Sequence, residues 1–435
     1  MRKLIAILTV ITLCAAACAS PKTDGVSYSK EQVKALLKEM PERASNLHHF
    51  YEVPKISDTK APSGYEPFYV SHFGRHGCRY HTSSSPYETA LGYLKKLDSL
   101  DQLTNYGKGL LEAVESLKYT QRGMDGMLTQ KGGQTHRGIA TRLAGRYPQI
   151  FNQSGRNDVR AFSSTVQRCI MSMSNFILGL EKAAPGLDIS MDTGARYMDY
   201  IAHSSSGAPA NRGGQIRDSM FKALFNPDRI CKLLFKDPKA PAKIFKDKEY
   251  NFYYSVINAG DIAQCLDTEV PNFYSELNLD ELYAFWAAND IGTVNNMGRT
   301  RENGGYRERV VGGPILNDIL NKAQDAIDGG KVCADFRFGH DSGIMPFLFL
   351  IRLNGFDETY SCAEAPSKWL CFKEVPMAAN VQFVFFRNKQ GSILVKVLLN
   401  ECERTFPALE AVNEVYYKWP VLRDYLQAIA DGKNK

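Results

Sequence analysis

Several familiar patterns are missing from this chain of 435 residues. It has no Cys-x-x-Cys pair and no His-Glu-x-x-His helix, so a structural or catalytic zinc site is not expected. After residue 18 no apolar run is long enough to cross a bilayer, and no internal repeat or low-complexity tract is present. The formal net charge of +6 is too small to indicate nucleic-acid binding. Any preference for anions must therefore come from a local cluster of arginines.

The first 18 residues have the organisation of a signal peptide, with a basic pair, the apolar run Leu4–Leu13 and small residues before Cys18. The small residues resemble a bacterial lipobox, which would leave a lipid on Cys18 as the only contact with a membrane. Because Ala15 stands where that motif usually has Leu, ordinary cleavage after an Ala-x-Ala site is the alternative. We expect residues 19–30 to form a flexible tether. The protein is expected to be exported, to the periplasm or outer membrane of a bacterium.

Eight cysteines remain after the signal region, and export would permit disulfides. Eight cysteines allow about 105 complete pairings, so the sequence does not fix the connectivity. Cys362 and Cys371 flank a short loop that contains proline, and we expect a disulfide between them. Cys78 and Cys169 lie next to candidate site residues and are interpreted as small packing groups rather than reactive thiols.

Strands followed by helices predict an α/β fold, with a mostly parallel central sheet and helices on both faces. A chain of this length is expected to form two domains. We assign residues 31–186 and 311–435 to the α/β core and residues 187–310 to an inserted, mostly helical cap. The predicted strands are residues 67–74, 159–162, 332–338, 381–387 and 392–399, the last two forming a hairpin, and the predicted helices are residues 86–100, 107–118, 133–147, 166–180, 279–289 and 343–353.

Polar side chains cluster directly after three of the predicted strands. The segment 75–79 has the pattern Arg-His-Gly-x-Arg after the first strand, and residues 163–168 follow the second strand. His340 and Asp341 follow the third strand. Because ligands of α/β sheets bind beyond the carboxyl ends of the strands, we expect these three clusters to form one site.

These residue types suit the transfer of a phosphoryl group from a phosphate monoester. His76 can attack phosphorus in line and form a phosphohistidine that water then hydrolyses. An alkoxide leaves poorly unless it is protonated, and Asp341 suits the role of proton donor. The groups that can neutralise the phosphate oxygens through charge-assisted hydrogen bonds are Arg75, Arg79, Arg168 and His340. This scheme requires neither a metal ion nor another cofactor.

With these motifs the chain resembles the histidine phosphatase superfamily, in the branch of acid phosphatases and phytases. Within that branch it is most similar to multiple inositol polyphosphate phosphatase, over roughly residues 65–185 and 310–400. The resemblance implies that His76 is the nucleophile and Asp341 the proton donor. It also implies the same phosphate clamp of three arginines and His340. The segments that carry the likeness are Leu128–Gly132, Ser163–Cys169, Phe176–Leu180 and Pro376–Asn380.

The second motif departs from the inositol polyphosphate group. That group typically has His-Ala-Glu, whereas this chain has His340-Asp341-Ser342-Gly343. His-Asp is typical of bacterial and fungal acid phosphatases and phytases, usually followed two residues later by Asn, where Gly343 stands here. The mixed signature leaves the substrate and the order of phosphate removal open.

Further polar residues have both a structural and a functional interpretation. His72 and His81 flank the first motif, and histidines in such positions are more often structural than in contact with substrate. Arginines of the cap region could read additional phosphates, although charged loop residues are usually only solvated. These arginines are Arg212, Arg217, Arg299, Arg301 and Arg307.

The sequence therefore predicts an exported, metal-independent phosphomonoesterase whose partner is a phosphorylated small molecule rather than a nucleic acid. Inositol polyphosphates such as phytate are the leading substrates. A sugar phosphatase, for example one acting on glucose 1-phosphate, or a broad acid phosphatase is the first alternative, and the cap would decide between them. A lipoprotein that binds a phosphorylated ligand without catalysis is the second alternative, but binding alone requires neither a nucleophile nor an acid.

Overall fold

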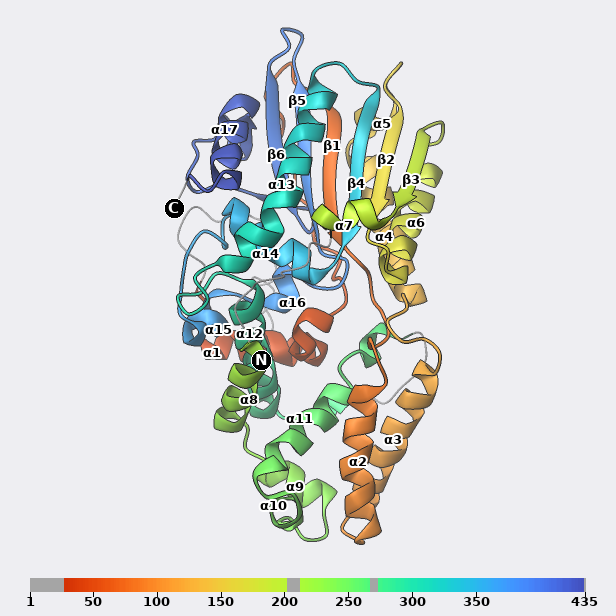
Figure 1. Cartoon of the computed structure of the whole chain (residues 1–435), viewed down its shortest axis with the longest axis vertical. Helices are drawn as coiled ribbons and strands as arrows, with labels where there is room; N and C mark the ends of the chain where they lie inside the picture. The colour runs from red at the N-terminus through yellow and green to blue at the C-terminus, as the bar shows by residue number, and fades with distance from the viewer. Residues whose placement is uncertain (1–26, 202–211, 267–272, 434–435) are drawn as a thin grey trace, which may run out of the picture.

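The computed structural model describes residues 27–201, 212–266 and 273–433, and an eight-stranded sheet lies in the upper half of the molecule as Figure 1 shows it. The strands are β1 (Glu66–Arg75), β2 (Asp158–Ser163), β3 (Asp188–Thr193), β4 (Val332–Gly339), β5 (Asn380–Arg387), β6 (Ile393–Leu399), β7 (Cys402–Arg404) and β8 (Tyr416–Lys418). The α-helices that precede β4 are α1 (Lys30–Glu39), α2 (Ser85–Ser99), α3 (Asn105–Gln121), α4 (Gln130–Arg146), α5 (Pro148–Phe151), α6 (Gln167–Ala183), α7 (Ala195–Ile201), α8 (Gly213–Leu224), α9 (Asp228–Leu234), α10 (Ala240–Phe245), α11 (Glu249–Ala259), α12 (Leu279–Met297) and α13 (Tyr306–Ile327). The α-helices that follow β4 are α14 (Asp341–Ile351), α15 (Ala365–Lys368), α16 (Cys371–Glu374) and α17 (Trp419–Ala430). The 3₁₀ helices are η2 (Pro41–His48), η3 (Lys246–Lys248), η4 (Ala263–Cys265), η5 (Phe273–Glu276) and η6 (Cys362–Glu364).

The sheet has a parallel half and an antiparallel half. Its strand order is β3-β2-β4-β1-β5-β6-β7, and β8 pairs with β6. The neighbours among β3, β2, β4 and β1 run parallel, whereas β5, β6 and β7 join in antiparallel pairs. Parallel neighbours require crossover connections, which the helical segments between these strands supply. The predicted α/β fold is confirmed, including its antiparallel pair at residues 381–399.

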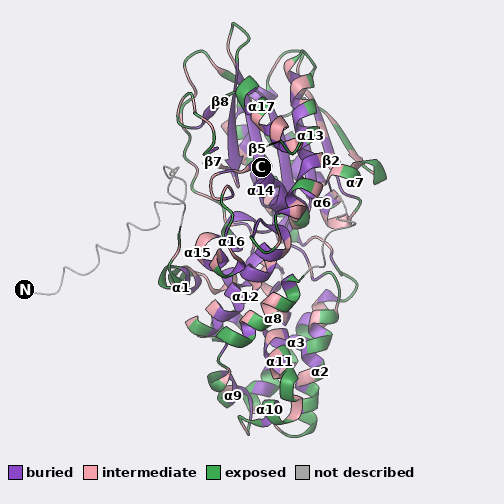
Figure 2. Cartoon of the chain, turned by 60° about the vertical axis from the view of Figure 1, so that its left-hand side comes forward, coloured by how far each residue is buried: buried purple, intermediate pink, exposed green. Residues whose placement is uncertain are grey.

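Helices cover both faces of the sheet, as the side chains of β1 illustrate. Tyr69 and Phe73 lie on the face where α13, α14 and α17 pack. Val70 and His72 lie on the opposite face, against α4, α5 and α6. Alternate residues of a strand point to opposite faces, so burial of both sets requires a covering layer on each side. The central strands β1, β4, β5 and β6 are almost wholly buried, and Figure 2 shows the middle of the sheet in the colour of buried residues.

β4 carries two charged residues into the interior, Asp335 and Arg337. Asp335 accepts hydrogen bonds from the Arg160 guanidinium at 2.8 and 2.9 Å and from the Tyr69 hydroxyl at 2.7 Å. The Nε atom of Arg337 donates to a carboxylate oxygen of Asp318 at 2.6 Å. Each of these buried charges therefore meets an opposite charge, which is the condition under which burial of an ion is tolerated.

A second, helical region lies below the sheet in Figure 1 and consists of α1, η2, α2, α3 and α8–α12. Its hydrophobic cluster joins Val33, Leu94 and Leu110 to Phe221 and Phe252. The sequence assigned α1–α3 to the α/β core, but these helices pack with the cap helices. An amphipathic helix has the same sequence pattern whichever partner covers its apolar face, so periodicity did not reveal the partner.

The edge of the sheet also differs from the predicted division of the chain. β3 lies inside residues 187–310, which the sequence assigned to the cap, yet it pairs with β2 from Asp158↔Asp188 to Ser163↔Thr193. Its side chains are mostly exposed or half-buried, as expected for an edge strand. Such a strand has no continuous apolar run, so its sequence gave little indication of a strand.

The expected disulfide between Cys362 and Cys371 is not formed, and both residues are buried free thiols. The Sγ atom of Cys362 donates to Oδ1 of Asn295 at 3.0 Å. The backbone N–H of Cys371 donates to Oδ1 of Asp290 at 3.1 Å. Asn295 and Asp290 lie on different turns of α12, so the two cysteines pack against separate parts of one helix. Their short separation in sequence therefore does not bring the sulfur atoms together.

The predicted signal peptide and Cys18 lie outside the described residues. The end of the predicted tether belongs to the fold, because the Tyr28 N–H donates to the Ser367 carbonyl at 2.6 Å. Ser29 then caps α1 by accepting a hydrogen bond from the Gln32 N–H at 3.2 Å. Within the described ranges, no helix combines the length and the apolar character that a bilayer-spanning segment requires.

Candidate active site

Backbone hydrogen bonds bring the ends of three parallel strands together. The His76 N–H, just after β1, donates to the Gly339 carbonyl at the end of β4 at 2.9 Å. The Ser164 N–H, just after β2, donates to the Phe338 carbonyl of β4 at 3.0 Å. Arg168 lies in the first turn of α6, which follows directly. The three clusters predicted from the sequence therefore meet at one edge of the sheet.

Gly77 of the first motif is required by close packing. A Cβ atom on Gly77 would lie 2.7 Å from the carbonyl oxygen of Gly132 in α4. A Cβ on Gly132 would in turn lie 2.4 Å from the carbonyl oxygen of Cys78. Only glycine at both positions permits this approach of two backbones. The motif loop is thereby held against the start of α4, and this fixes the direction of the neighbouring His76 side chain.

The His76 ring is buried, with 2% of the residue exposed. Its Nδ1 atom lies 2.9 Å from the Gly77 carbonyl oxygen, and a carbonyl only accepts, so Nδ1 carries the proton. Burial, followed by the positive charges of Arg75, Arg79 and Arg168, holds the pKa of His76 well below its usual range. The ring is therefore neutral, and Nε2 keeps a free lone pair.

Arg75 is fully buried at the end of β1. Its Nη1 atom donates to the carbonyl oxygens of Leu47 at 2.7 Å and Val375 at 2.8 Å. Its Nη2 atom lies 3.2 Å from Oδ2 of Asp341. These contacts fix the plane of the guanidinium group. They also tie the ends of β1 and β4 to each other through an ion pair.

Arg79 and Arg168 each place a guanidinium group beside a histidine. Nη2 of Arg79 donates to Nε2 of His48 at 3.1 Å, and Nη1 donates to the Tyr80 carbonyl at 2.9 Å. Nη2 of Arg168 lies 3.3 Å from Nδ1 of His340. Burial and the charge of a neighbouring arginine lower the pKa of Arg79 to about 10, so it remains protonated at neutral pH.

Two hydrogen bonds define the tautomer of His340. Its Nδ1 atom faces a donor of Arg168, so Nδ1 accepts, and Nε2–H donates to the Ser164 hydroxyl at 3.0 Å. Burial, followed by the charge of Arg168, lowers the pKa of His340 to about 4. The ring centroids of His340 and His76 lie 5.6 Å apart, and the two rings meet edge to face. Both imidazoles are therefore neutral within one cluster of positive charges.

Asp341 begins α14, and a quarter of its side chain is exposed. Its Oδ1 atom accepts a hydrogen bond from the Ser342 N–H at 2.9 Å, as expected at the start of a helix. Burial alone raises the pKa of a carboxyl group, but the charges of Arg75 and Arg79 outweigh burial and hold the pKa of Asp341 at about 2. The carboxyl is therefore ionised at neutral pH when the site contains no anion.

Positive charge is in excess in this cluster. Among the described residues, the guanidinium groups of Arg75, Arg79 and Arg168 have one direct carboxylate partner, because Asp341 pairs with Arg75 whereas Asp261 contacts His48. In addition, the buried Nε atom of each arginine lacks a hydrogen-bond partner among the described residues. Buried donors without acceptors are rare because each costs about 1–3 kcal/mol, and they call for an unseen acceptor. An anion with several oxygens would supply both the missing charge and the missing acceptors.

His72 lies outside this cluster of contacts, and His81 meets it only through the His48 ring, whose centroid lies 6.1 Å away. His72 packs between Phe176, Phe336 and Phe338, and burial lowers its pKa to about 3. The His81 ring packs on Tyr87, and burial likewise lowers its pKa to about 3. Both histidines are neutral packing groups, in agreement with the structural interpretation of the sequence.

Three of the five cap arginines that could read additional phosphates already have anionic partners. Arg299 is buried and donates to Glu308 at 2.7 Å, whereas Arg301 forms an exposed pair with Glu364 at 3.2 Å. Arg217 pairs with Asp218 at 2.7 Å and lies over the ring of Tyr254. These contacts account for the three side chains as structural or surface charges. Arg212 is exposed at the start of α8 and Arg307 is half-buried in α13.

Two residues of this cluster were not identified from the sequence, His48 and Asp261. His48 contacts Arg79, as described above, and its Nδ1 atom pairs with Oδ2 of the buried Asp261. They are 213 positions apart in the chain and belong to no local motif, so no pattern in one sequence marks them. Only the packing of the helical region against the sheet reveals their association.

The two cysteines beside the motif residues are buried thiols. The Sγ atom of Cys169 lies 3.2 Å from the Gly339 carbonyl oxygen, and burial raises its pKa to about 12. The Sγ atom of Cys78 lies 2.8 Å from that of Cys265, and burial raises the pKa of Cys78 well above its usual range. Neither sulfur is a thiolate at neutral pH, which agrees with their interpretation as packing groups.

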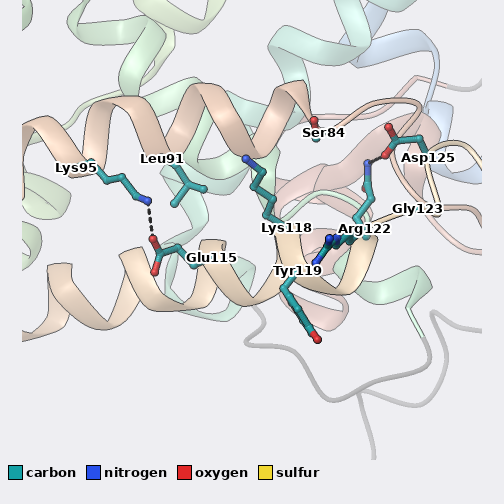
Figure 3. Close-up of a pocket in the computed structure, with 10 residues that line it drawn as sticks. Ser84, Leu91, Lys95, Glu115, Lys118, Tyr119, Arg122, Gly123 and Asp125 are labelled. Carbon is teal, nitrogen blue, oxygen red and sulfur yellow. Dashed lines mark hydrogen bonds and ion pairs between the residues drawn. The ribbon is translucent and has the colours of Figure 1, made fainter.

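A separate hollow of about 510 Å³ lies between α2 and α3 (Figure 3). Lys95 and Glu115 line it and pair with each other at 2.7 Å, as the dashed line in Figure 3 marks. None of the predicted site residues lines this hollow. No histidine is among the residues that line the hollow, so the strand-end cluster, with its neutral imidazoles and excess positive charge, is the candidate active site. In the described part of the chain, no group of three or more His, Cys, Asp and Glu side chains is placed to hold a metal ion.

Comparison with solved structures identifies the same fold in several phosphatases. The multiple inositol polyphosphate phosphatase of Bifidobacterium longum, in complex with inositol hexasulfate, is 21% identical with a TM-score of 0.73 and matches 88% of this chain and 97% of its own. The complex of the same enzyme with phosphate is 19% identical with a TM-score of 0.75, and the match covers 90% of this chain and 98% of that one. The phytase from D. castellii is 13% identical with a TM-score of 0.68, and the match covers 94% of this chain and 91% of the phytase. At these identities the likeness establishes the fold.

Sequence comparisons add a family. Human multiple inositol polyphosphate phosphatase 1 is 38% identical over 65 residues, which are 15% of this chain and only 13% of that protein. The family model "Histidine phosphatase superfamily (branch 2)" matches residues 70–236 and 230–400, well over half of the chain. The protein therefore belongs to branch 2 of the histidine phosphatase superfamily, which confirms the superfamily and the phosphatase class predicted from its sequence.

Proposed function

We propose that this protein hydrolyses phosphate monoesters through a phosphohistidine on His76, and that inositol polyphosphates are its substrates. The observation that carries the proposal is the excess of positive charge around a neutral imidazole whose Nε2 lone pair is free. A phosphate dianion fits this site in charge and in its number of acceptor oxygens. His76, Arg75, Arg79, Arg168, His340 and Asp341 make up the machinery.

In the first step, Nε2 of His76 attacks phosphorus and the bond from phosphorus to the ester oxygen breaks. The electron pair of that bond goes to the leaving oxygen, which takes a proton from Asp341. The guanidinium groups of Arg75, Arg79 and Arg168 stabilise the negative charge on the equatorial oxygens. Nδ1–H of His76, held by the Gly77 carbonyl, keeps the ring oriented during the attack.

Asp341 must be protonated before it can act as the acid. In the site without an anion its pKa is about 2, because Arg75 and Arg79 favour the carboxylate. A bound phosphate offsets those positive charges and therefore raises the pKa of Asp341. Substrate binding thus increases the protonated fraction of Asp341. Because that fraction is largest at low pH, catalysis is favoured at acidic pH.

In the second step, water attacks phosphorus and the bond from nitrogen to phosphorus breaks. Asp341, now a carboxylate, takes a proton from the water, and phosphate is released from a neutral His76. All groups required for both steps are side chains of this chain, so we propose that turnover needs no metal ion. Full activity in excess chelator is expected, and a loss that an added metal reverses would contradict this part of the proposal.

Two sources support inositol polyphosphates as the substrate class. Relatives of the same fold include a multiple inositol polyphosphate phosphatase in complex with inositol hexasulfate and a phytase. The sequence motifs around residues 128–132 and 376–380 also resemble that group. A sugar phosphatase or a broad acid phosphatase is the second candidate, because His340-Asp341 is the form typical of acid phosphatases and phytases rather than the His-Ala-Glu of the inositol polyphosphate group.

The experiment that separates these candidates is phosphate release from phytate, glucose 1-phosphate and p-nitrophenyl phosphate at pH 4–7. We expect the highest kcat/KM for phytate. A preference for glucose 1-phosphate would contradict inositol polyphosphates as the substrate class but would be consistent with the phosphohistidine mechanism. Tight phosphate binding without release from any of the three would instead favour a non-catalytic phospholigand-binding protein.

We also propose that the protein is exported and anchored by a lipid on Cys18, on the basis of the signal-like first 18 residues. Metabolic labelling with a fatty acid, compared between the natural chain and a Cys18→Ser variant, tests the anchor. Label and membrane association are expected only in the natural chain. Equal partition of both chains into the soluble fraction would contradict the lipid.

A further inference from the structure

Arg79 of the phosphate clamp is connected to the helical region through a histidine and a carboxylate. Nη2 of Arg79 contacts Nε2 of His48 at 3.1 Å, and Nδ1 of His48 pairs with Oδ2 of Asp261. The other oxygen of Asp261 accepts a hydrogen bond from the Tyr274 hydroxyl at 3.0 Å. Asp261 follows α11 and is buried, with 4% of the residue exposed.

The donors and acceptors along this connection leave one arrangement of protons. A guanidinium group has donors and no acceptor, so Nε2 of His48 must accept from Arg79. The remaining ring nitrogen, Nδ1, then carries the proton and donates to the Asp261 carboxylate. A carboxylate that holds the N–H of a histidine fixes both the tautomer and the orientation of the ring. Asp261 therefore keeps His48 in the form that can accept from Arg79.

We propose that His48 and Asp261 form a positioning dyad that orients Arg79 toward the substrate phosphate. Two contacts on one side of the guanidinium group, to His48 and to the Tyr80 carbonyl, fix its plane. The buried Nε–H of Arg79 has no acceptor in the described part of the chain, so it could donate to a phosphate oxygen. His48 and Asp261 act through Arg79 and need not touch the substrate. The inference rests on the proposed function, because it concerns the same phosphate site.

The segment that carries Asp261 is held firmly against the motif loop, as a positioning role requires. The Lys131 ammonium, at the start of α4, donates to the Gln264 carbonyl at 2.5 Å. The Sγ atom of Cys265 lies 2.8 Å from that of Cys78, the residue before Arg79. The helical region therefore contributes to the clamp through a buried, well-packed contact rather than through a surface loop.

Protonation of His48 would reverse the contact with Arg79. A second proton on the ring places an N–H on Nε2, directly opposite the N–H of the guanidinium group, and the two donors repel each other. The contact with Arg79 therefore depends on an Nε2 atom that keeps its lone pair.

The test is a double-mutant cycle read out as phosphate affinity. The full chain is titrated calorimetrically with inorganic phosphate as wild type, His48→Leu, Arg79→Ala and the double variant. Because charge-assisted hydrogen bonds to phosphate depend on geometry, we expect His48→Leu to weaken binding about tenfold in the wild-type background. In the Arg79→Ala background the same change should alter the affinity by less than about twofold. A residue with a purely structural role would give the same loss in both backgrounds.

Two further variants sharpen the result. His48→Gln keeps an acceptor for Arg79 and a donor for Asp261, so it should recover most of the affinity lost in His48→Leu. His49→Gln is the matched control, because the neighbouring His49 is buried and contacts Glu52 and Gln264 instead of the clamp. It should bind phosphate within about twofold of wild type.

The possible outcomes are distinct. Equal losses in both backgrounds, or equal losses in His48→Leu and His49→Gln, would overturn the positioning dyad and leave the proposed phosphatase intact. If His48→Leu fails to fold, a loss of the same size in Asp261→Asn that disappears in the Arg79→Ala background supports the proposal, and wild-type affinity in Asp261→Asn overturns it. A wild-type chain that binds no phosphate would overturn both the dyad and the proposed function.

Discussion

The strand-end site and the helical region differ in whether their arginines have carboxylate partners. At the strand ends, only one of three clustered arginines, Arg75, pairs with a carboxylate, and the buried Nε atoms of all three have no acceptor among the described residues. In the helical region, Arg217 and Arg229 each pair with a carboxylate within the same region, and aromatic side chains fill the interior. Charges that serve stability are paired, whereas charges that await a ligand are left unbalanced. The difference therefore locates function at the strand ends without reference to any motif.

The largest effect is expected from loss of the proposed acid. Asp341→Asn should lower kcat about 10²–10⁴-fold, because the leaving oxygen then receives no proton. For the wild type, the protonated fraction of Asp341 falls tenfold for each pH unit above its pKa in the complex. Its kcat should therefore fall toward alkaline pH, whereas the variant should have a flat profile in that range. The measurement is kcat from pH 3 to 8.

The leaving group provides the control for this prediction. p-Nitrophenolate leaves with little protonation, so its ester should lose less activity in Asp341→Asn than an alkyl phosphate loses. Equal losses for both esters, or an unchanged pH profile, would contradict the role of Asp341 as the acid.

The paired charges of the sheet should affect stability. Asp335 is fully buried and accepts from the half-buried Arg160 and from Tyr69, so Asp335→Asn removes the charge that this arginine pairs with and should lower the free energy of unfolding by about 3 kcal/mol. The control is Asp280→Asn, since Asp280 forms an exposed pair with Lys34 and should contribute less than about 1 kcal/mol. Urea unfolding of both variants measures the difference, and comparable losses would contradict the contrast.

Removal of one clamp arginine should affect activity rather than stability. Arg168→Ala should lower kcat/KM about 100-fold. The negative charge on the phosphate oxygens in the transition state then loses one of the guanidinium groups that stabilise it. The matched variant from the helical region, Arg217→Ala, should remain within about twofold of wild type, since Arg217 already pairs with Asp218. Equal losses in the two variants would remove the distinction between the two regions.

The smallest effect concerns a buried acid of the helical region. Asp290 of α12 is fully buried, and burial raises its pKa to about 7. A folded-state pKa above the unfolded value means that the folded protein binds more protons between about pH 4 and 7, so stability falls as pH rises through that window. Asp290→Asn should remove this decrease, with a gain of about 1–2 kcal/mol at pH 8 relative to pH 5. Parallel pH profiles of unfolding for wild type and variant would contradict it.

Much of the strand-end site could be predicted from the sequence because its chemistry is local. Arg75, His76 and Arg79 share one short motif, and strands of strong apolar character precede each of the three clusters. Parallel neighbours then place the clusters at one edge. The site thus follows from local patterns together with one general rule of sheet topology.

The contribution of the helical region could not be predicted, because it depends on packing between distant segments. His48 and Asp261 have no motif, and α1–α3 have the same amphipathic pattern whichever core they join. Sequence proximity was likewise misleading for Cys362 and Cys371, which pack on different turns of α12. Local sequence patterns specify helices and strands, whereas the segments that each of them packs against are specified by the whole fold.

Transfer of a phosphoryl group to His76 can be measured directly by rapid-quench mass spectrometry. Asp341→Asn is the suitable variant, because p-nitrophenyl phosphate can still donate its phosphoryl group while the second step lacks its base. We predict a stoichiometric burst of p-nitrophenol and a phosphate on the peptide that contains His76, both absent in His76→Ala. Steady turnover by the wild type with no phosphate on His76 at any time point, or near-normal activity of His76→Ala, would contradict the mechanism.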